Sequence, residues 1–91
     1  MCVINLKSFL DGRSYPEAGE LFYSEILKYI SDTDRIVVNM SDVDLLPSMF
    51  LNVSIGKLID TYGKQRVKET ISFTMITKSQ ASRLKDYFER Y

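Results

Sequence analysis

The period of the hydrophobic positions changes several times along the chain, which predicts alternating strands and helices. An apolar run at residues 3–6 and a β-branched run at residues 36–38 are typical of strands, the second covered on both faces. Residues 70–75 alternate between polar and apolar side chains, which predicts a third strand at or near a sheet edge. Phe9 and Leu10 could extend the first strand after a bend.

Helical periodicity predicts a first helix that opens at Ser14 and runs to about residue 30. Ser14 and Glu17 have the spacing of a capping box. Gly19 inside a helix costs ~1 kcal/mol relative to alanine, so it could mark the close approach of another element. We expect residues 31–34 to turn the chain into the second strand. The apolar stripe of this helix is predicted to contain Ala18, Leu21, Phe22, Ile26, Tyr29 and Ile30.

Two further helices are predicted after the second and third strands. One begins near Ser48 and ends at Gly63, which stands where a left-handed C-terminal cap belongs. We expect residues 64–69 to form a basic connection. The last helix opens with a capping box formed by Thr77 and Gln80. Its buried side is predicted to contain Ala81, Leu84, Phe88 and Tyr91.

The predicted order is therefore β-α-β-α-β-α in a single domain, residues 1–91. This alternation points to an α/β fold with a mainly parallel sheet, packed by helices that form right-handed crossovers. Binding surfaces of such sheets lie beyond the carboxyl ends of the strands. That rule places residues 11–14, 40–48 and 77–78 on one rim, which we expect to be the working surface.

Composition bounds the class of protein more than its activity. The 91 residues, 45% of them hydrophobic, suffice for one core, and the single cysteine, Cys2, cannot form an internal disulfide. No apolar run is long enough to span a membrane, and no basic leader precedes a hydrophobic segment, so we expect a soluble cytoplasmic protein. Zero net charge argues against nucleic-acid binding, although basic residues gather in residues 63–91.

The residue types in the chain give little basis for an enzyme. The chain has no histidine, no glycine-rich phosphate loop and no set of metal ligands, so we expect neither catalysis nor a cofactor or metal. Asp42 and Asp44 stand in a turn before a helix, where acidic residues usually serve turn formation. The rim residues expected to contact a protein partner are Asp42, Asp44, Leu46, Pro47, Ser48, Met49 and Asn52.

Ser48 is the rim residue with the most specific expected chemistry. It stands where a serine side chain could cap the first turn of a helix, and where free amides favour an anion. Capping alone would explain it, whereas phosphorylation would add roughly two negative charges to the same place. Ser41 and Ser54 are weaker candidates, expected in a turn and on a helix surface. Gly12 and Arg13 could hold an anion, but an ion pair between Arg13 and the acidic first helix is an equal alternative.

The motifs together resemble the STAS-like family of unknown function, shortened relatives of the domain shared by sulfate transporters and anti-sigma-factor antagonists. The resemblance implies a non-enzymatic signalling module that binds a protein partner, often a histidine-kinase-like ATPase that phosphorylates a serine at the start of the helix after a central strand. Ser48 matches that serine in position, although Leu46-Pro47-Ser48-Met49 replaces the family's acidic-serine-serine-glycine turn and Asn39 replaces a frequent aspartate. The resemblance rests on Gly12-Arg13-Ser14-Tyr15, Gly19, Ile36-Val37-Val38-Asn39-Met40-Ser41-Asp42-Val43, Phe50-Leu51-Asn52 and Ile55-Gly56-Lys57-Leu58.

Three functions are consistent with these patterns. The leading hypothesis is a regulatory protein-protein interaction module, similar to the anti-sigma-factor antagonists, that is controlled by serine phosphorylation. It binds its partner through residues 42–50 and the exposed side of the helix that follows. The alternative is a small-molecule module in which Gly12, Arg13 and Ser48 hold a nucleotide or another anion on the rim. A third option is a purely structural subunit of a larger assembly, which an oligomer contact of the last helix would favour. The sequence does not specify an oligomeric state.

Overall fold

The three predicted strands form one sheet with helical segments between them. The computed structural model describes residues 2–31 and 35–90, so the predicted turn at residues 32–34 and Tyr91 lie outside the described residues. The elements, in chain order, are β1 (Cys2–Asn5), α1 (Leu6–Leu10), α2 (Tyr15–Tyr29), β2 (Ile36–Asn39), α3 (Ser48–Asn52), α4 (Ile55–Tyr62), α5 (Lys64–Thr70), β3 (Ile71–Thr74) and α6 (Lys78–Glu89).

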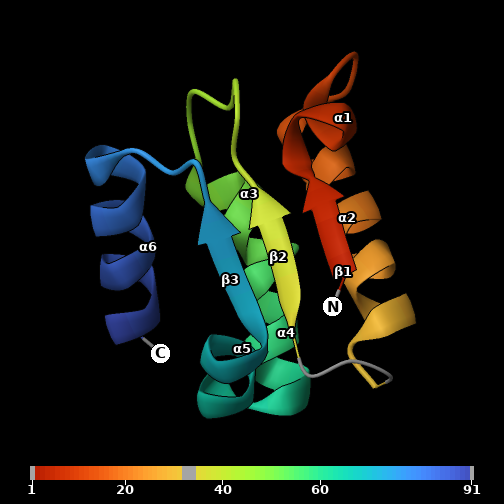
Figure 1. The fold of residues 1–91 in the computed structure, drawn as a ribbon, viewed down its shortest axis with the longest axis vertical. Coiled ribbons are helices and arrows are strands. Elements are labelled where there is room, and N and C mark those ends of the chain that lie inside the picture. Colours follow the sequence, from red (N-terminus) through yellow and green to blue (C-terminus); the bar gives the residue numbers. More distant parts are fainter. Residues whose placement is uncertain (1, 32–34, 91) are drawn as a thin grey trace.

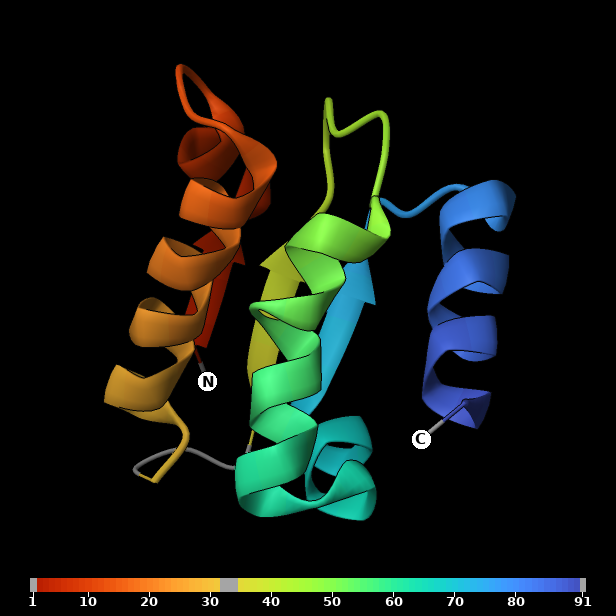
Figure 2. The same ribbon diagram turned by 180° about the vertical axis from the view of Figure 1, so that it is seen from behind.

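The sheet is parallel throughout, with the strand order β1-β2-β3. Cys2 pairs with Ile36, and Ile36 pairs with Ile71, so the three strands are in register from their first residues. The predicted α/β class and the position of β3 at an edge are therefore confirmed. Figures 1 and 2 show α2, α3 and α4 on one face of the sheet and α6 beside β3.

The core lies between the sheet and the helices that cover it. Ile4, Ile36 and Val38 project from the strands toward this layer and are buried. The rings of Phe22 in α2 and Phe50 in α3 stack with their centroids 5.8 Å apart. Burial on this scale supplies the main driving force for folding. No helix in the described part of the chain is both long enough and apolar enough to cross a bilayer.

The segment after β1 is a short helix, so the predicted extension of the strand through Phe9 and Leu10 is wrong. Ser8 Oγ donates a hydrogen bond to the Asn5 carbonyl (2.7 Å), which turns the chain directly after the strand. Leu6 is fully buried, and the Phe9 ring meets the Phe22 ring edge-on at 6.1 Å. A helical turn lets both apolar side chains reach the core, whereas successive strand residues would alternate between two faces.

The predicted helix from Ser48 to Gly63 is interrupted. Ser54 Oγ donates to the Phe50 carbonyl (2.8 Å) at the break between α3 and α4, and Ser54 is fully buried rather than on a helix surface. Gly63 ends α4 with a positive φ of 88°, but its ψ of 151° is extended, so it is not the left-handed cap that was predicted. That conformation suits glycine and starts the next helix at once.

Helix α5 replaces the predicted basic connection. Lys64 Nζ donates to the Phe88 carbonyl (2.9 Å) near the end of α6, and Arg66 Nη2 donates to the Ile30 carbonyl (3.0 Å) at the end of α2. Cations are favourable at helix C-termini because the last carbonyls there lack helical partners. These two basic side chains therefore tie α5 to the C-terminal ends of α2 and α6.

The predicted apolar stripes of α2 and α6 are confirmed in part, since Ala18, Phe22, Ile26 and Ile30 are fully buried and Leu84 and Phe88 are buried. The buried faces differ from the stripes at the remaining positions. Leu21 and Tyr29 are each 40% exposed, whereas Gly19 is buried. In α6 the predicted Ala81 is exposed, and the buried residues are Gln80, Leu84, Tyr87 and Phe88. The Thr77–Gln80 capping box is confirmed, because each side chain accepts from the backbone amide of the other residue. The Ser14 cap is present too, since Ser14 Oγ accepts from the Glu17 amide at 3.4 Å.

Candidate functional site

The segments predicted to share a rim lie together beyond the carboxyl ends of the strands (Figure 1). We call the central segment, residues 40–47, the rim loop. Met40 N donates to the Thr74 carbonyl (2.9 Å), and Val43 N donates back to the Met40 carbonyl (3.1 Å). Asp42 adopts φ 65°, a conformation that aspartate tolerates in turns, and Asn39 Oδ1 accepts from the Ser41 amide (2.9 Å). The rim loop is therefore a structured turn attached to the end of β3.

The rim loop buries one set of apolar side chains and exposes another. Leu46 is 3% exposed and belongs to the core, so this predicted partner residue faces inward. Leu45 is 64% exposed and Met49, in the first turn of α3, is 54% exposed. The other predicted partner residues are placed as follows: Asp42, Asp44, Ser48 and Asn52 are exposed, and Pro47 is half-buried.

Ser48 does not cap α3, which corrects the predicted capping role. Pro47 is the N-cap, and its carbonyl accepts from the amides of Phe50 (3.0 Å) and Leu51 (3.1 Å). A capping side chain must come from the residue before the first helical position, and Ser48 already occupies that position. Its hydroxyl is turned instead toward α6, where Ser48 Oγ accepts from Arg83 Nη2 at 3.2 Å.

Helix α6 is fastened to the rim loop and to α3 by three polar side chains. Gln80 Nε2 donates to the carbonyls of Val43 and Asp44, and Arg83 Nε donates to the Leu46 carbonyl. The Tyr87 hydroxyl donates to Asn52 Oδ1 at 2.8 Å. The contacts of Gln80 and Arg83 satisfy backbone carbonyls of the rim loop that have no partner within the loop. They were not predicted, although the spacing of residues 80, 83 and 87 places all three side chains on one face of a helix.

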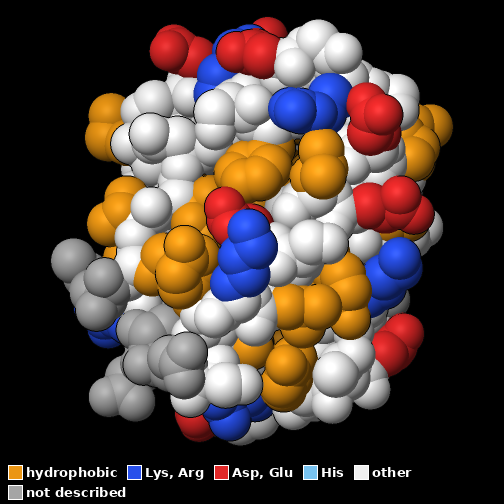
Figure 3. Space-filling view, turned by 90° about the vertical axis from the view of Figure 1, so that its right-hand side faces the viewer, with side chains coloured by type: hydrophobic (Ala, Val, Ile, Leu, Met, Phe, Trp, Pro, Cys, Tyr) orange, Lys and Arg blue, Asp and Glu red, His pale blue; other side chains and the backbone are white. Residues whose placement is uncertain are grey.

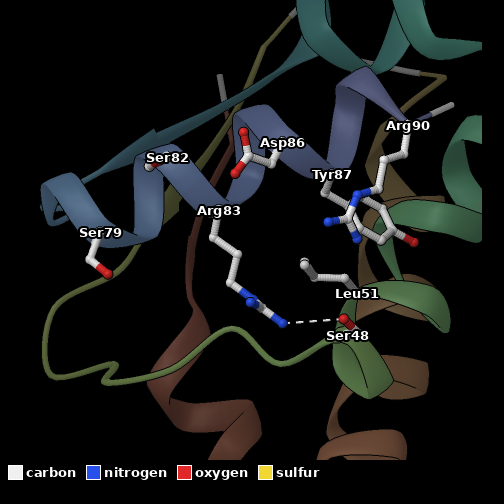
Figure 4. A pocket seen from close by; sticks show the side chains of 8 residues that line it. All are labelled: Ser48, Leu51, Ser79, Ser82, Arg83, Asp86, Tyr87 and Arg90. Atoms are coloured by element: carbon white, nitrogen blue, oxygen red, sulfur yellow. Dashed lines mark hydrogen bonds between the residues drawn. The ribbon is translucent and has the colours of Figure 1, made fainter.

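A hollow of about 330 Å³ lies between α3 and α6, and Figure 4 shows its lining. In this view Arg83 reaches from α6 toward Ser48, and the Asp86 carboxylate points away from Ser48. We call this cavity between the two helices the α3–α6 hollow. The residues that line it are Ser48, Leu51, Ser79, Ser82, Arg83, Asp86, Tyr87 and Arg90.

A second hollow, of about 240 Å³, separates the rim loop from the chain around α1. Arg13 lines it, but Arg13 Nη1 also donates to the carbonyls of Ser8 and Phe9 (both 3.3 Å) and so covers the end of α1. Gly12 next to it has φ 73°, which explains a glycine in this turn. Arg13 and Ser48 line different hollows, so the structure does not bring the three residues of the predicted anion site together. The whole lining is Lys7, Leu10, Arg13, Tyr15, Asp42, Val43, Asp44 and Leu45.

The flank formed by β1 and α2 also carries exposed apolar side chains. Val3 is 60% exposed, and Leu21 and Leu27 in α2 are 40% and 37% exposed. Figure 3 shows that hydrophobic side chains on this side of the molecule are interrupted by acidic and basic ones. Scattered exposure of this kind is usual on protein surfaces, so the flank is suitable as a comparison surface for the rim.

One comparison with known proteins gives a match. A family model described as a STAS-like domain of unknown function matches residues 18–81, which is more than two thirds of the chain. The matched segment runs from α2 to the first turn of α6 and includes β2, the rim loop and β3. No curated protein and no solved structure matches the chain.

Proposed function

We propose that this chain, which belongs to the STAS-like family of unknown function, is a regulatory domain that binds a protein partner through the rim loop and the first turn of α3. The observation that carries the proposal is the exposure of Leu45 and Met49, at 64% and 54%, beside the buried Leu46 and Phe50. Large apolar side chains held in the open by a structured loop lose little entropy on contact and are effective anchors.

The surroundings of these two side chains suit a protein partner. Asp42 and Asp44 are exposed in the same loop and would form a polar margin around an apolar centre, as in many transient interfaces. Met49 has a flexible thioether side chain, which adapts its shape to different surfaces. The resemblance to partner-switching domains makes a histidine-kinase-like ATPase the class of partner that we propose.

Ser48 offers a way to switch this interface. It is exposed and directly precedes Met49, so a phosphoryl group there would bring roughly two negative charges to the edge of the contact. Charge added to an apolar contact opposes binding, because it must be desolvated when the partner covers it. We propose that phosphorylation of Ser48 releases the partner.

The experiment is a titration of the purified chain with a histidine-kinase-like ATPase from the same cells, followed by calorimetry. The variants Leu45→Asp and Met49→Asp are expected to weaken binding at least about tenfold, which corresponds to ~1.4 kcal/mol. Leu21→Asp, on the comparison flank, is the matched control and is expected to bind as the wild type does. Thermal unfolding of each variant verifies the fold. Binding that is unchanged in both rim variants would contradict the proposal.

A further inference from the structure

The lining of the α3–α6 hollow brings cations and hydroxyl groups together on one small surface. Arg83 and Arg90 contribute two guanidinium groups, against the single carboxylate of Asp86. Three serine hydroxyls, from Ser48, Ser79 and Ser82, complete the polar wall. The hollow therefore offers a net positive charge together with many hydrogen-bond donors, the combination that binds phosphate oxygens.

Arg83 is held in place by two contacts. Its Nε donates to the Leu46 carbonyl, and its Nη2 donates to Ser48 Oγ at 3.2 Å. A guanidinium has five N–H donors, so most of the fork stays available to a ligand. Fixing the side chain beforehand lowers the entropy cost of binding.

Arg90 is the second cation that lines the hollow. It is the C-cap residue directly after α6, seven residues after Arg83, and this spacing places both side chains on the same side of the helix, two turns apart. Within residues 2–31 and 35–90, neither guanidinium forms an ion pair with a carboxylate. In Figure 4 the Asp86 carboxylate is directed away from Ser48, so it does not occupy the space that Arg83 faces.

We infer that the α3–α6 hollow binds a phosphoryl group, with Arg83 and Arg90 as its cationic ligands. The phosphoryl group has two possible sources: a free phosphate, or Ser48 itself after phosphorylation. The second source rests on the proposed function. In that case the phosphoryl oxygens pair with Arg83 across the hollow, and the modification fastens α6 to α3 instead of standing in solvent.

The first arm of the test uses inorganic phosphate and the unmodified full chain. Phosphate is titrated at constant ionic strength while amide and arginine side-chain signals are followed by NMR. If free phosphate binds, the NMR chemical shifts of residues in the hollow change saturably with phosphate concentration. These changes are lost in Arg83→Gln and in Arg90→Gln. Lys85→Gln, an exposed position of α6 outside the lining, is the matched control and keeps the response.

The second arm uses chain with phosphoserine incorporated at residue 48 during translation. Thermal unfolding of phosphorylated and unmodified chains is compared in the wild type, Arg83→Gln and Arg90→Gln. A phosphoryl group held by the arginines raises the Tm of the wild type by about 4 °C, and the gain shrinks in both variants. Arg90→Gln is included because Arg83 also bonds the Leu46 carbonyl, so its loss alone could weaken the fold.

The two arms identify the source and also separate this inference from the proposed function. Arginine-dependent shifts with phosphate support the free source, and an arginine-dependent rise in Tm supports the Ser48 source. If phosphate causes no saturable shift and phosphorylation gives no arginine-dependent stabilisation, the inference is overturned. Partner affinity of the phosphorylated chain is measured separately: a release of the partner without arginine dependence would support the proposed switch alone.

Discussion

A Cβ atom added to Gly19 would lie 2.9 Å from the carbonyl oxygen of Phe50, so α2 and α3 meet almost backbone to backbone. The same Cβ would lie 2.5 Å from Val53 Cγ2. This is the close approach that a glycine inside a helix predicted. The contact fixes the position of α3, and with it the position of Ser48 and Met49 on the rim.

Gly19→Ala is therefore expected to destabilise the protein, although alanine is the better helix former by ~1 kcal/mol. The backbone of Phe50 cannot move without shifting α3, so we expect a net loss of about 1–3 kcal/mol in urea unfolding. Adding Val53→Ala should restore part of this loss by removing the nearer contact. Ser24→Ala, at an exposed position of α2, is the control. An unfolding free energy of Gly19→Ala at or above the wild type would show that the two helices can separate freely.

Leu45 and Leu46 are adjacent in sequence but differ in burial, at 64% and 3% exposed. Leu46→Ala is expected to cost about 2–5 kcal/mol because it leaves a cavity in the core. Leu45→Ala is expected to change stability by no more than about 0.5 kcal/mol. Chemical denaturation of the two variants measures this difference, and equal losses of stability would contradict a buried Leu46 beside an exposed Leu45.

Gln80 is 4% exposed and joins the capping box of α6 to the rim loop. Gln80→Leu keeps much of the volume but leaves the Val43 and Asp44 carbonyls without this donor, and we expect a loss of about 1–3 kcal/mol. Gln80→Glu should be worse, since a carboxylate would face two carbonyl oxygens. Lys85→Ala on the exposed side of α6 is the control. Hydrogen exchange should show α6 amides losing protection first, and unchanged protection would contradict the role of Gln80 as a link.

The three candidate serines are separated by burial. Ser54 is fully buried and donates to the Phe50 carbonyl, so Ser54→Asp places a carboxylate in the core and is expected to prevent stable folding. Ser48 and Ser41 lie on or near the surface, and Ser48→Asp is expected to leave stability within about 0.5 kcal/mol of the wild type. Circular dichroism during thermal unfolding distinguishes the variants. A well-folded Ser54→Asp protein would return Ser54 to the set of candidate modification sites.

The order of elements could be predicted because it depends on local patterns. The β-branched run at residues 36–38 and the Thr77–Gln80 spacing each act within a few residues of their own position. Gly19 was informative for a related reason: it breaks a local rule, and tertiary packing explains the exception.

The break between α3 and α4 and the geometry of the candidate site could not be predicted, because both depend on tertiary contacts. Helical periodicity predicted one uninterrupted helix across Ser54, because nothing in the sequence indicates that the Ser54 hydroxyl donates to the Phe50 carbonyl. The predicted N-cap of α3 was displaced by one residue, since Pro47 and not Ser48 occupies the N-cap position and supplies its carbonyl. Arg83 gave no signal in the sequence because its two partners, Leu46 and Ser48, are more than 30 positions away.

The strand order β1-β2-β3 gives the chain a direction of assembly. Each strand pairs with the strand that precedes it in the chain, so within the sheet that residues 2–31 and 35–90 form, no strand is inserted between two earlier ones. During synthesis from the N-terminus, β1, α2 and β2 are therefore all present when β3 leaves the ribosome. Helix α6 follows all three strands in the chain, and it completes the rim by donating to the loop carbonyls that the earlier segments leave open.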